Sequence, residues 1–274
     1  MSPCVYRAGV SIFAGGVWGI FGDRLLRIYL TGALQAENGK RLLRESQLGG
    51  PQGRFVFAYL VTERKRAVSQ SELADAIWPG ALPGSWGVAL SAIVSKLRSQ
   101  LGGLGLDRTR IIGNAFGCYQ FTPPLEIWVD VEAALAGLDA AEGLLGAGKP
   151  EAAYGPSLIA TTILRRPFLP GDDTTWANGR RDALASALVR ALDCRIEALV
   201  ANGEPELALS HAREAVRLDP YRESGYRKLM RVQAQMGERG EAVRAYKELQ
   251  KLLADELGVE PSDETTSVYR EIAG

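Results

Sequence analysis

The chain is poor in the residues on which most enzyme and metal sites depend. Its 274 residues include a single histidine, His211, and three cysteines, Cys4, Cys118 and Cys194, that lie far apart. One histidine cannot form a multi-histidine metal site, and the cysteines lack metal-ligand spacing. Scattered cysteines, odd in number, are typical of a reducing compartment, which predicts a cytoplasmic protein. We expect no enzymatic activity, no cofactor and no bound metal.

The sequence also has little that resembles a membrane segment. Residues 9–22 are uncharged and mostly apolar, but they are rich in glycine and too few to cross a bilayer. They resemble the apolar part of a signal peptide, yet no convincing cleavage site follows them. We therefore expect residues 1–23 to be a disordered extension and predict no membrane attachment.

The formal net charge is zero, but the charges are unevenly distributed. Residues 24–121 contain 13 basic and 6 acidic residues, a net charge of +7, whereas residues 122–274 contain 18 basic and 25 acidic residues, a net charge of −7. This division suggests that only the front part approaches a polyanion. Chance segregation of charge is the alternative interpretation.

Residues 24–122 are predicted to form short strands, then three helices, then a hairpin. Asn38 and Gly39 separate two strand-like runs, and both can adopt the positive φ that a tight turn requires. Ser69 and Glu72 form a capping box at the start of the second helix. The strands are expected at residues 25–30, 34–37, 40–43, 109–112 and 118–121. This order predicts a winged helix-turn-helix with an added N-terminal antiparallel sheet.

The third helix, residues 89–101, has two contrasting faces. One is an apolar stripe at helical spacing: Leu90, Ile93, Val94, Leu97 and Leu101. The other has small side chains with cations on its flanks: Ala92, Ser95, Lys96, Arg98 and Ser99. A slim face flanked by cations fits a DNA major groove. The same pattern also describes an ordinary amphipathic surface helix, but the neighbouring elements favour the DNA-binding interpretation.

Residues 126–274 are predicted to be helical throughout, after a linker at residues 122–124. Gly203 and Gly237 lie 34 residues apart, and Ala208 and Ala242 keep the same offset. This is the tetratricopeptide period of two helices per repeat. Such pairs bury their apolar sides by stacking on their neighbours, which leaves a surface for a partner.

Both parts resemble one family. Residues 69–78 and 89–101 are similar to the second and recognition helices of the OmpR/PhoB-type domain found in the Streptomyces antibiotic regulatory protein (SARP) family. Residues 163–169, 218–223 and especially 255–262 resemble the bacterial transcriptional activation domain that follows it in that family. The resemblance covers about residues 25–272.

The resemblance implies a sequence-specific transcription activator that binds promoter repeats in double-stranded DNA as a homodimer. DNA contacts would fall on the recognition helix and the hairpin wing: Ala92, Ser95, Lys96, Arg98, Ser99 and Asn114. The family places polymerase contacts in the loop between the second and third helices. For this chain the resemblance assigns contacts with the sigma subunit to Trp78, Leu82 and Trp86.

The sequence departs from the family in ways that leave an alternative open. Ser95 and Ser99 stand where basic residues are frequent, and the predicted wing loop, residues 113–117, has no cation. Fewer phosphate contacts imply modest binding by one domain, so useful binding needs a second copy or a partner. The alternative function is a protein–protein adaptor with a winged helix that no longer binds DNA.

A second alternative is a nucleotide-binding enzyme. Residues 143–149 have the glycine and lysine spacing of a phosphate-binding loop, but Pro150 replaces the hydroxyl residue that would bind magnesium. No strand pattern precedes the loop. We expect a boundary between two helices at this place instead.

Overall fold

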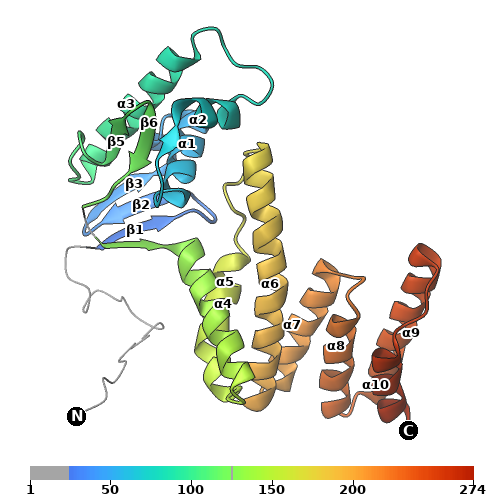
Figure 1. The fold of residues 1–274 in the computed structure, drawn as a ribbon. Helices are drawn as coiled ribbons and strands as arrows, with labels where there is room; N and C mark the ends of the chain where they lie inside the picture. The colour runs from blue at the N-terminus through green and yellow to red at the C-terminus, as the bar shows by residue number, and fades with distance from the viewer. Residues whose placement is uncertain (1–24, 125) are drawn as a thin grey trace, which may run out of the picture. The chain divides into compact units, whose positions relative to one another are not determined.

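The chain divides into two compact units, which join between Val129 and Asp130 (Figure 1). The computed structural model describes residues 25–124 and 126–274, so the expectation for residues 1–23 lies outside the described residues. In the part of the chain that is described, no helix has the length and apolar character needed to cross a membrane.

The first unit combines two small sheets with three helices. One sheet has the strand order β3-β2-β1-β7 and the other the order β4-β6-β5. The strands are β1 (Leu25–Tyr29), β2 (Gln35–Asn38), β3 (Arg41–Arg44), β4 (Val68–Ser69), β5 (Ile112–Ala115), β6 (Cys118–Phe121) and β7 (Glu126–Val129). The helices are a short 3-10 helix (Glu45–Gln47), α1 (Gly50–Thr62), α2 (Gln70–Ile77) and α3 (Trp86–Gly103). The predicted winged helix-turn-helix with an N-terminal sheet is confirmed.

The N-terminal sheet differs from the expectation at one edge. Strands β1, β2 and β3 are antiparallel, as predicted, but β7 pairs in parallel with β1, opposite Leu25 to Ile28. Residues 126–129 therefore belong to the sheet of the first unit, although the sequence pattern assigned them to the helical part. Strand β4 was also not predicted, because two residues are too few to show an alternating pattern.

The turn between β2 and β3 is shifted by one residue from the prediction. Asn38 pairs with Arg41, which leaves Gly39 and Lys40 as the two turn residues. Gly39 has a φ of +59°, as the first position of a type II′ turn requires. The Asn38 side chain instead donates a hydrogen bond to the Leu104 carbonyl oxygen at 3.0 Å.

Helix α1 forms the centre of the first unit. Its seven residues from Phe55 to Val61 are all buried, which explains why the helix is apolar nearly all round. The Phe57 ring meets the Phe121 ring of β6 edge-on, with centroids 6.1 Å apart. The core of this unit therefore lies between α1, the wing sheet and the apolar side of α3.

The second unit consists of helices, each packed on the next one along the chain. They are α4 (Asp130–Gly146), a 3-10 helix (Glu151–Ala153), α5 (Tyr154–Leu164), α6 (Thr175–Ala201), α7 (Pro205–Leu218), α8 (Glu223–Gln235), α9 (Arg239–Leu257) and α10 (Asp263–Ala273). Gly203 and Gly237 have φ values of +76° and +79° in equivalent turns before α7 and α9. Ala208 and Ala242 are buried at equivalent positions of those two helices. The predicted repeat is therefore present in the structure.

The family-like residues 255–262 connect α9 to α10. Gly258 ends α9 with a φ of +67°, and the Val259 amide donates to the Leu253 carbonyl oxygen at 3.2 Å. The Ser262 hydroxyl accepts a hydrogen bond from the Thr265 amide and so caps α10. Ser262 also donates to the Glu223 carboxylate of α8 at 2.6 Å. The motif thus ends one helix, begins the next and fixes the start of α10 to α8.

Residues 143–149 form the last turn of α4 and the residues that follow it. The Lys149 amide donates to the Leu144 carbonyl oxygen at 2.9 Å, and the Gly148 amide donates to that of Leu145. These two bonds, with Gly148 at a φ of +68°, make the usual glycine-ended helix terminus. The helix boundary predicted for this stretch is confirmed, and its glycines are explained by helix termination.

Candidate nucleic-acid interface

Helix α3 presents opposite faces to the core and to solvent. Leu90, Val94, Leu97 and Leu101 have no exposed surface, and Ile93 is half-buried. The other face is exposed along Ala92, Ser95, Lys96 and Ser99. The predicted apolar stripe is confirmed. The opposite face consists of short side chains that would let a ligand come close to the backbone of the helix.

The helix is longer at both ends than residues 89–101. The sequence pattern places Trp86 in the preceding loop. In the structure Trp86 is instead the first residue of α3. Trp78 ends α2 and is half-buried, whereas Leu82 is 46% exposed in the loop between the two helices. Val88, in the first turn of α3, is 74% exposed. Two apolar side chains therefore face solvent beside the start of α3.

Lys96 lies against the beginning of α1. A Cβ atom on Gly49, the residue that precedes α1, would be 3.1 Å from Cδ of Lys96. The aliphatic part of Lys96 therefore packs over Gly49 while the residue as a whole stays exposed. Because the first turn of a helix favours anions, Lys96 and the start of α1 together favour a phosphate.

Arg98 does not flank the exposed face as the sequence pattern suggested. It is half-buried, and its Nε and Nη2 atoms donate to the Ile112 carbonyl oxygen at 3.0 and 2.7 Å. These bonds fasten α3 to the first residue of β5. We expect Arg98 to act by positioning the wing relative to α3, which is a different task from the base or phosphate contact predicted for it.

Replacing Arg98 by alanine is therefore expected to lower the free energy of unfolding by about 2 kcal/mol, because the buried Ile112 carbonyl loses a charged donor. Lys96→Ala on the same helix is the matched control and should change it by less than about 0.5 kcal/mol. Urea unfolding followed by tryptophan fluorescence measures both variants. Equal stability of the two variants would show that Arg98 does not brace the wing.

The hairpin wing also differs from the expectation. Strand β5 begins at Ile112 where it was predicted to end, and Asn114 lies within this strand, opposite Tyr119. Asn114 is exposed, but it is not at the tip of the wing. The tip is the two-residue turn of Phe116 and Gly117. The five-residue loop expected from residues 113–117 is thus much shorter, because its first three residues pair in the sheet.

Two cations beside α3 were missed by the sequence analysis. Arg108 and Arg110 are exposed in the turn before β5, where Thr109 bonds through its amide to the Asp107 carboxylate at 2.8 Å. A Cβ atom on Gly102 would overlap the Arg108 side chain, so Arg108 lies over the last turn of α3. The strand predicted for residues 109–112 included Arg110, which the structure places in the turn instead. Their place in an exposed turn makes them candidates for phosphate contacts.

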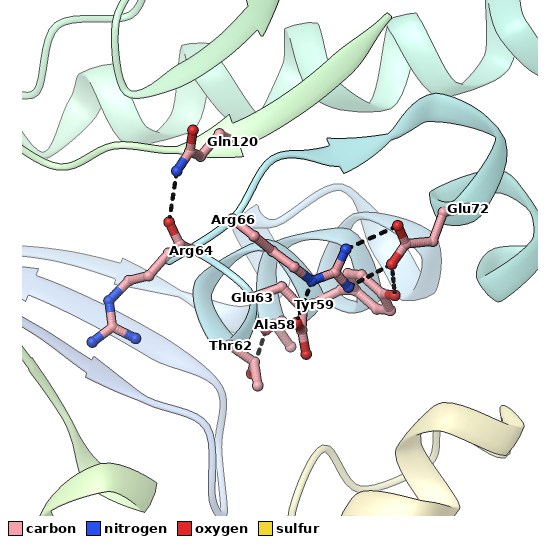
Figure 2. A network of polar contacts seen from close by, with 8 residues as sticks. All are labelled: Ala58, Tyr59, Thr62, Glu63, Arg64, Arg66, Glu72 and Gln120. Carbon is pink, nitrogen blue, oxygen red and sulfur yellow. Dashed lines mark hydrogen bonds and ion pairs between the residues drawn. The ribbon is translucent and has the colours of Figure 1, made fainter.

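Two residues of the basic cluster at residues 64–66 join elements of the first unit (Figure 2). Arg66 pairs with the carboxylates of Glu63 at 2.9 Å and Glu72 at 2.5 Å. Tyr59 of α1 also donates to Glu72, at 2.8 Å. The backbone carbonyl of Arg64 accepts a bond from the Gln120 side chain of β6 at 3.0 Å. These contacts connect the end of α1 to α2 and to the wing sheet.

The capping box predicted at Ser69 and Glu72 is half present. The Ser69 hydroxyl accepts a hydrogen bond from the Glu72 amide at 3.1 Å. The Glu72 side chain does not complete the box and binds Arg66 and Tyr59 instead. Hydrogen bonding to Arg66 holds the pKa of Glu72 below its usual range, and burial raises the pKa of Tyr59 to about 12.

Because of this network, the free energy of unfolding of the first unit should fall at acid pH. A lowered carboxyl pKa in the folded state means that Glu72 stabilises the fold above its unfolded pKa, and that this contribution is lost as the pH falls through the folded pKa. Between roughly pH 6 and pH 3, wild type should therefore lose more stability than Glu72→Gln. Urea unfolding at both pH values measures the difference. Parallel losses in the two proteins would rule out this role for Glu72.

One protein family matches the second unit directly. The profile described as "Bacterial transcriptional activator domain" matches residues 129–273, more than half of the chain. The match includes every helix from α4 to α10.

Individual relatives extend the match to the winged-helix unit. The chain is 29% identical over 217 residues to the transcriptional regulatory protein EmbR of Mycobacterium tuberculosis, covering 78% of this chain and 55% of EmbR. It is 27% identical over 220 residues to the regulatory protein AfsR of Streptomyces coelicolor, covering 78% of this chain and 21% of AfsR. The chain thus spans about half the length of EmbR and a smaller part of AfsR.

A solved structure shows the same fold. EmbR of Mycobacterium tuberculosis, in complex with a low-affinity phosphopeptide, superposes with a TM-score of 0.80 at 26% identity, covering 90% of this chain and 65% of that one. The order of a winged helix and helical repeats is therefore shared across nearly the whole chain. Together with the activator-domain match, it shows that the chain belongs to the SARP family of transcriptional regulators.

Proposed function

We propose that the chain binds specific sites in double-stranded DNA through the exposed face of α3 and activates transcription there. The observation that carries this proposal is the contrast between the two faces of α3. Its buried leucines fix the helix on the core, while Ala92, Ser95 and Ser99 leave a slim outer face beside Lys96. A rigid helix with such a face can enter a major groove and bring its backbone close to base edges.

The few cations on and beside α3 support a modest affinity for DNA by each copy of the chain. Lys96 lies on the outer face of α3, and Arg108 and Arg110 lie in the exposed turn that follows the helix. Each phosphate that a cation neutralises adds to the affinity and to its dependence on salt. With a few such contacts per domain, we propose that two copies bind neighbouring repeats as a homodimer. Arg98 would keep the wing beside the site, and the exposed Asn114 of the wing would contact the adjacent DNA.

The loop between α2 and α3 supports a contact with the polymerase sigma subunit. Leu82 is 46% exposed between Pro79 and Pro83, and prolines restrict the conformations of such a loop. An exposed apolar side chain on a restrained loop is suited to a protein partner. We propose that Leu82 makes the central contact, with the half-buried Trp78 and Trp86 supporting the two ends of the loop.

Selection of duplexes from a random-sequence DNA library by the full-length protein tests the DNA-binding proposal. We expect a recurrent sequence motif, bound more tightly than a scrambled duplex in fluorescence anisotropy. If no motif is enriched and both duplexes bind equally weakly, the proposal is wrong. The adaptor function, with a winged helix that does not bind DNA, would then be favoured.

Transcription in vitro with purified RNA polymerase holoenzyme tests the sigma contact. Leu82→Asp should reduce activation several-fold without changing the affinity for the selected duplex, because a charge replaces the apolar contact. Leu42→Asp, at another exposed leucine of the first unit, is the control and should leave activation unchanged. Full activation by Leu82→Asp would exclude this loop as the contact.

A further inference from the structure

The tip of the wing contains a residue poorly suited to its backbone conformation. Phe116 and Gly117 are the two central residues of the β5–β6 turn, and their φ values are +51° and +72°. Positive φ at both positions defines a type I′ turn, which prefers Asn, Asp or Gly at its first position. For a bulky residue such as phenylalanine this backbone region is unfavourable.

The Phe116 side chain gains no compensating contact from the residues that the structure describes. Its relative exposure is 104%, so the ring stands completely in solvent. A single exposed apolar residue needs no special explanation by itself. A fully exposed ring on a residue whose backbone conformation is unfavourable does need one, since asparagine would suit the turn better. Such a combination indicates that the ring has a function outside the fold.

The hairpin is fixed to its neighbours both at its turn and at its base. The Gly117 carbonyl oxygen accepts a hydrogen bond from the Gln70 amide at 2.9 Å, at the start of α2. The first residue of β5 is bound by Arg98 of α3. The hairpin is therefore fixed to both helices of the helix-turn-helix, and α3 and the ring keep a constant separation. The neighbours Ala115 and Gly117 are small and exposed, so neither of them shields the ring from a ligand.

We propose that Phe116 inserts as an apolar wedge between base pairs of the minor groove next to the major groove that α3 occupies. This inference rests on the proposed function and adds the second groove to it. Proteins that insert phenylalanine from the minor groove unstack one base step and kink the duplex. Phe116 would thus add a preference for a deformable step, such as TA or CA, at a fixed distance from the bases that α3 reads.

The shape of the tip favours DNA over a protein partner. An aromatic residue that anchors a protein interface is normally surrounded by other contacts that exclude water. Here the adjacent residues provide one methyl group and one glycine, which offers little area to a protein. A wedge between base pairs needs only the ring and slim flanks, which is what the turn provides.

The experiment uses the duplex recovered by selection from random DNA, with 2-aminopurine placed in turn at each step outside the α3 site. Wild type should raise the fluorescence at one step, because unstacking relieves quenching. Phe116→Asn should bind about tenfold more weakly, since a stacked ring is lost, and should raise no fluorescence. It should nevertheless melt at a higher temperature than wild type, because asparagine suits the turn. Phe116→Trp should retain both the affinity and the signal.

Leu207→Gln, at a half-exposed leucine of α7, is the control for loss of an exposed apolar side chain and should behave as wild type. If Phe116→Asn keeps full affinity and fluorescence, the wedge is disproved while DNA binding by α3 stands. If the variant loses only the activation of transcription, Phe116 contacts a protein and the wedge is again disproved. If wild type enriches no duplex at all, the proposed function fails and the wedge fails with it.

Discussion

Ser95→Glu is expected to abolish specific DNA binding while leaving the fold intact. Ser95 lies in the middle of the exposed face of α3, where a new carboxylate would face the phosphates and acceptor-rich base edges of the groove. Placing like charges together in an interface costs several kcal/mol, which corresponds to a loss of affinity of at least about a hundredfold. Fluorescence anisotropy with the selected duplex measures the loss.

Ser186→Glu provides the matched control. Ser186 is an exposed serine of a helix, α6, in the second unit, so the same charge is introduced far along the chain from α3. The control should bind DNA as wild type does. Both variants should unfold at the urea concentration of wild type, because exposed substitutions rarely change stability by more than about 0.5 kcal/mol. Unchanged binding by Ser95→Glu would mean that this face of α3 does not enter DNA.

Leu97→Ala, on the opposite face of the same helix, should destabilise the fold. Leu97 has no exposed surface and packs towards α1, where its Cδ2 atom lies 4.0 Å from the position of a Cβ on Gly53. Removing a buried leucine leaves a cavity and lowers the free energy of unfolding by about 3 kcal/mol. Urea unfolding measures this change.

The control for Leu97→Ala is Leu207→Ala, at a leucine that is 50% exposed in α7. It should change stability by less than about 1 kcal/mol, because less apolar surface returns to water. A similar small effect for both variants would contradict the orientation of α3. Together with Ser95→Glu, the pair distinguishes the face of α3 that holds the fold from the face proposed to hold the ligand.

The two faces of α3 could be predicted because both follow from helical periodicity within one segment. Leu90, Val94 and Leu97 recur at the spacing of a buried stripe, and the structure buries all three. The motif at residues 255–262 was equally informative, since its glycine, proline and serine directly specify helix ends. Local rules were sufficient in both places.

Features that depend on how separate helices and strands pack together could not be predicted. Arg98 has the periodicity of a flanking cation, and only the position of β5 beside α3 explains its bonds to Ile112. Strand β7 pairs with β1 about a hundred residues away, so nothing near residue 126 indicates a parallel partner. Glu72 had a capping partner within three residues, but Arg66 and Tyr59 compete for its carboxylate once α1 and α2 pack.

The prediction of the wing turn was wrong for a different reason. Glycines at both ends of residues 113–117 suggested a five-residue loop, whereas a two-residue turn is normally indicated by asparagine followed by glycine. Phenylalanine occupies the asparagine position here, so the usual sequence signal of the turn is missing. Phe116, whose presence removes the usual sequence signal of the turn, is also the residue whose side chain is fully exposed.

The affinity of wild type and Lys96→Ala for the selected and scrambled duplexes, measured across a range of salt concentrations, tests the central claim most directly. Binding of the selected duplex should be tighter and should weaken linearly on logarithmic axes, and Lys96→Ala should reduce that slope by about one phosphate contact. Equal affinity for both duplexes, or affinity that does not depend on salt, would contradict a DNA-binding face on α3.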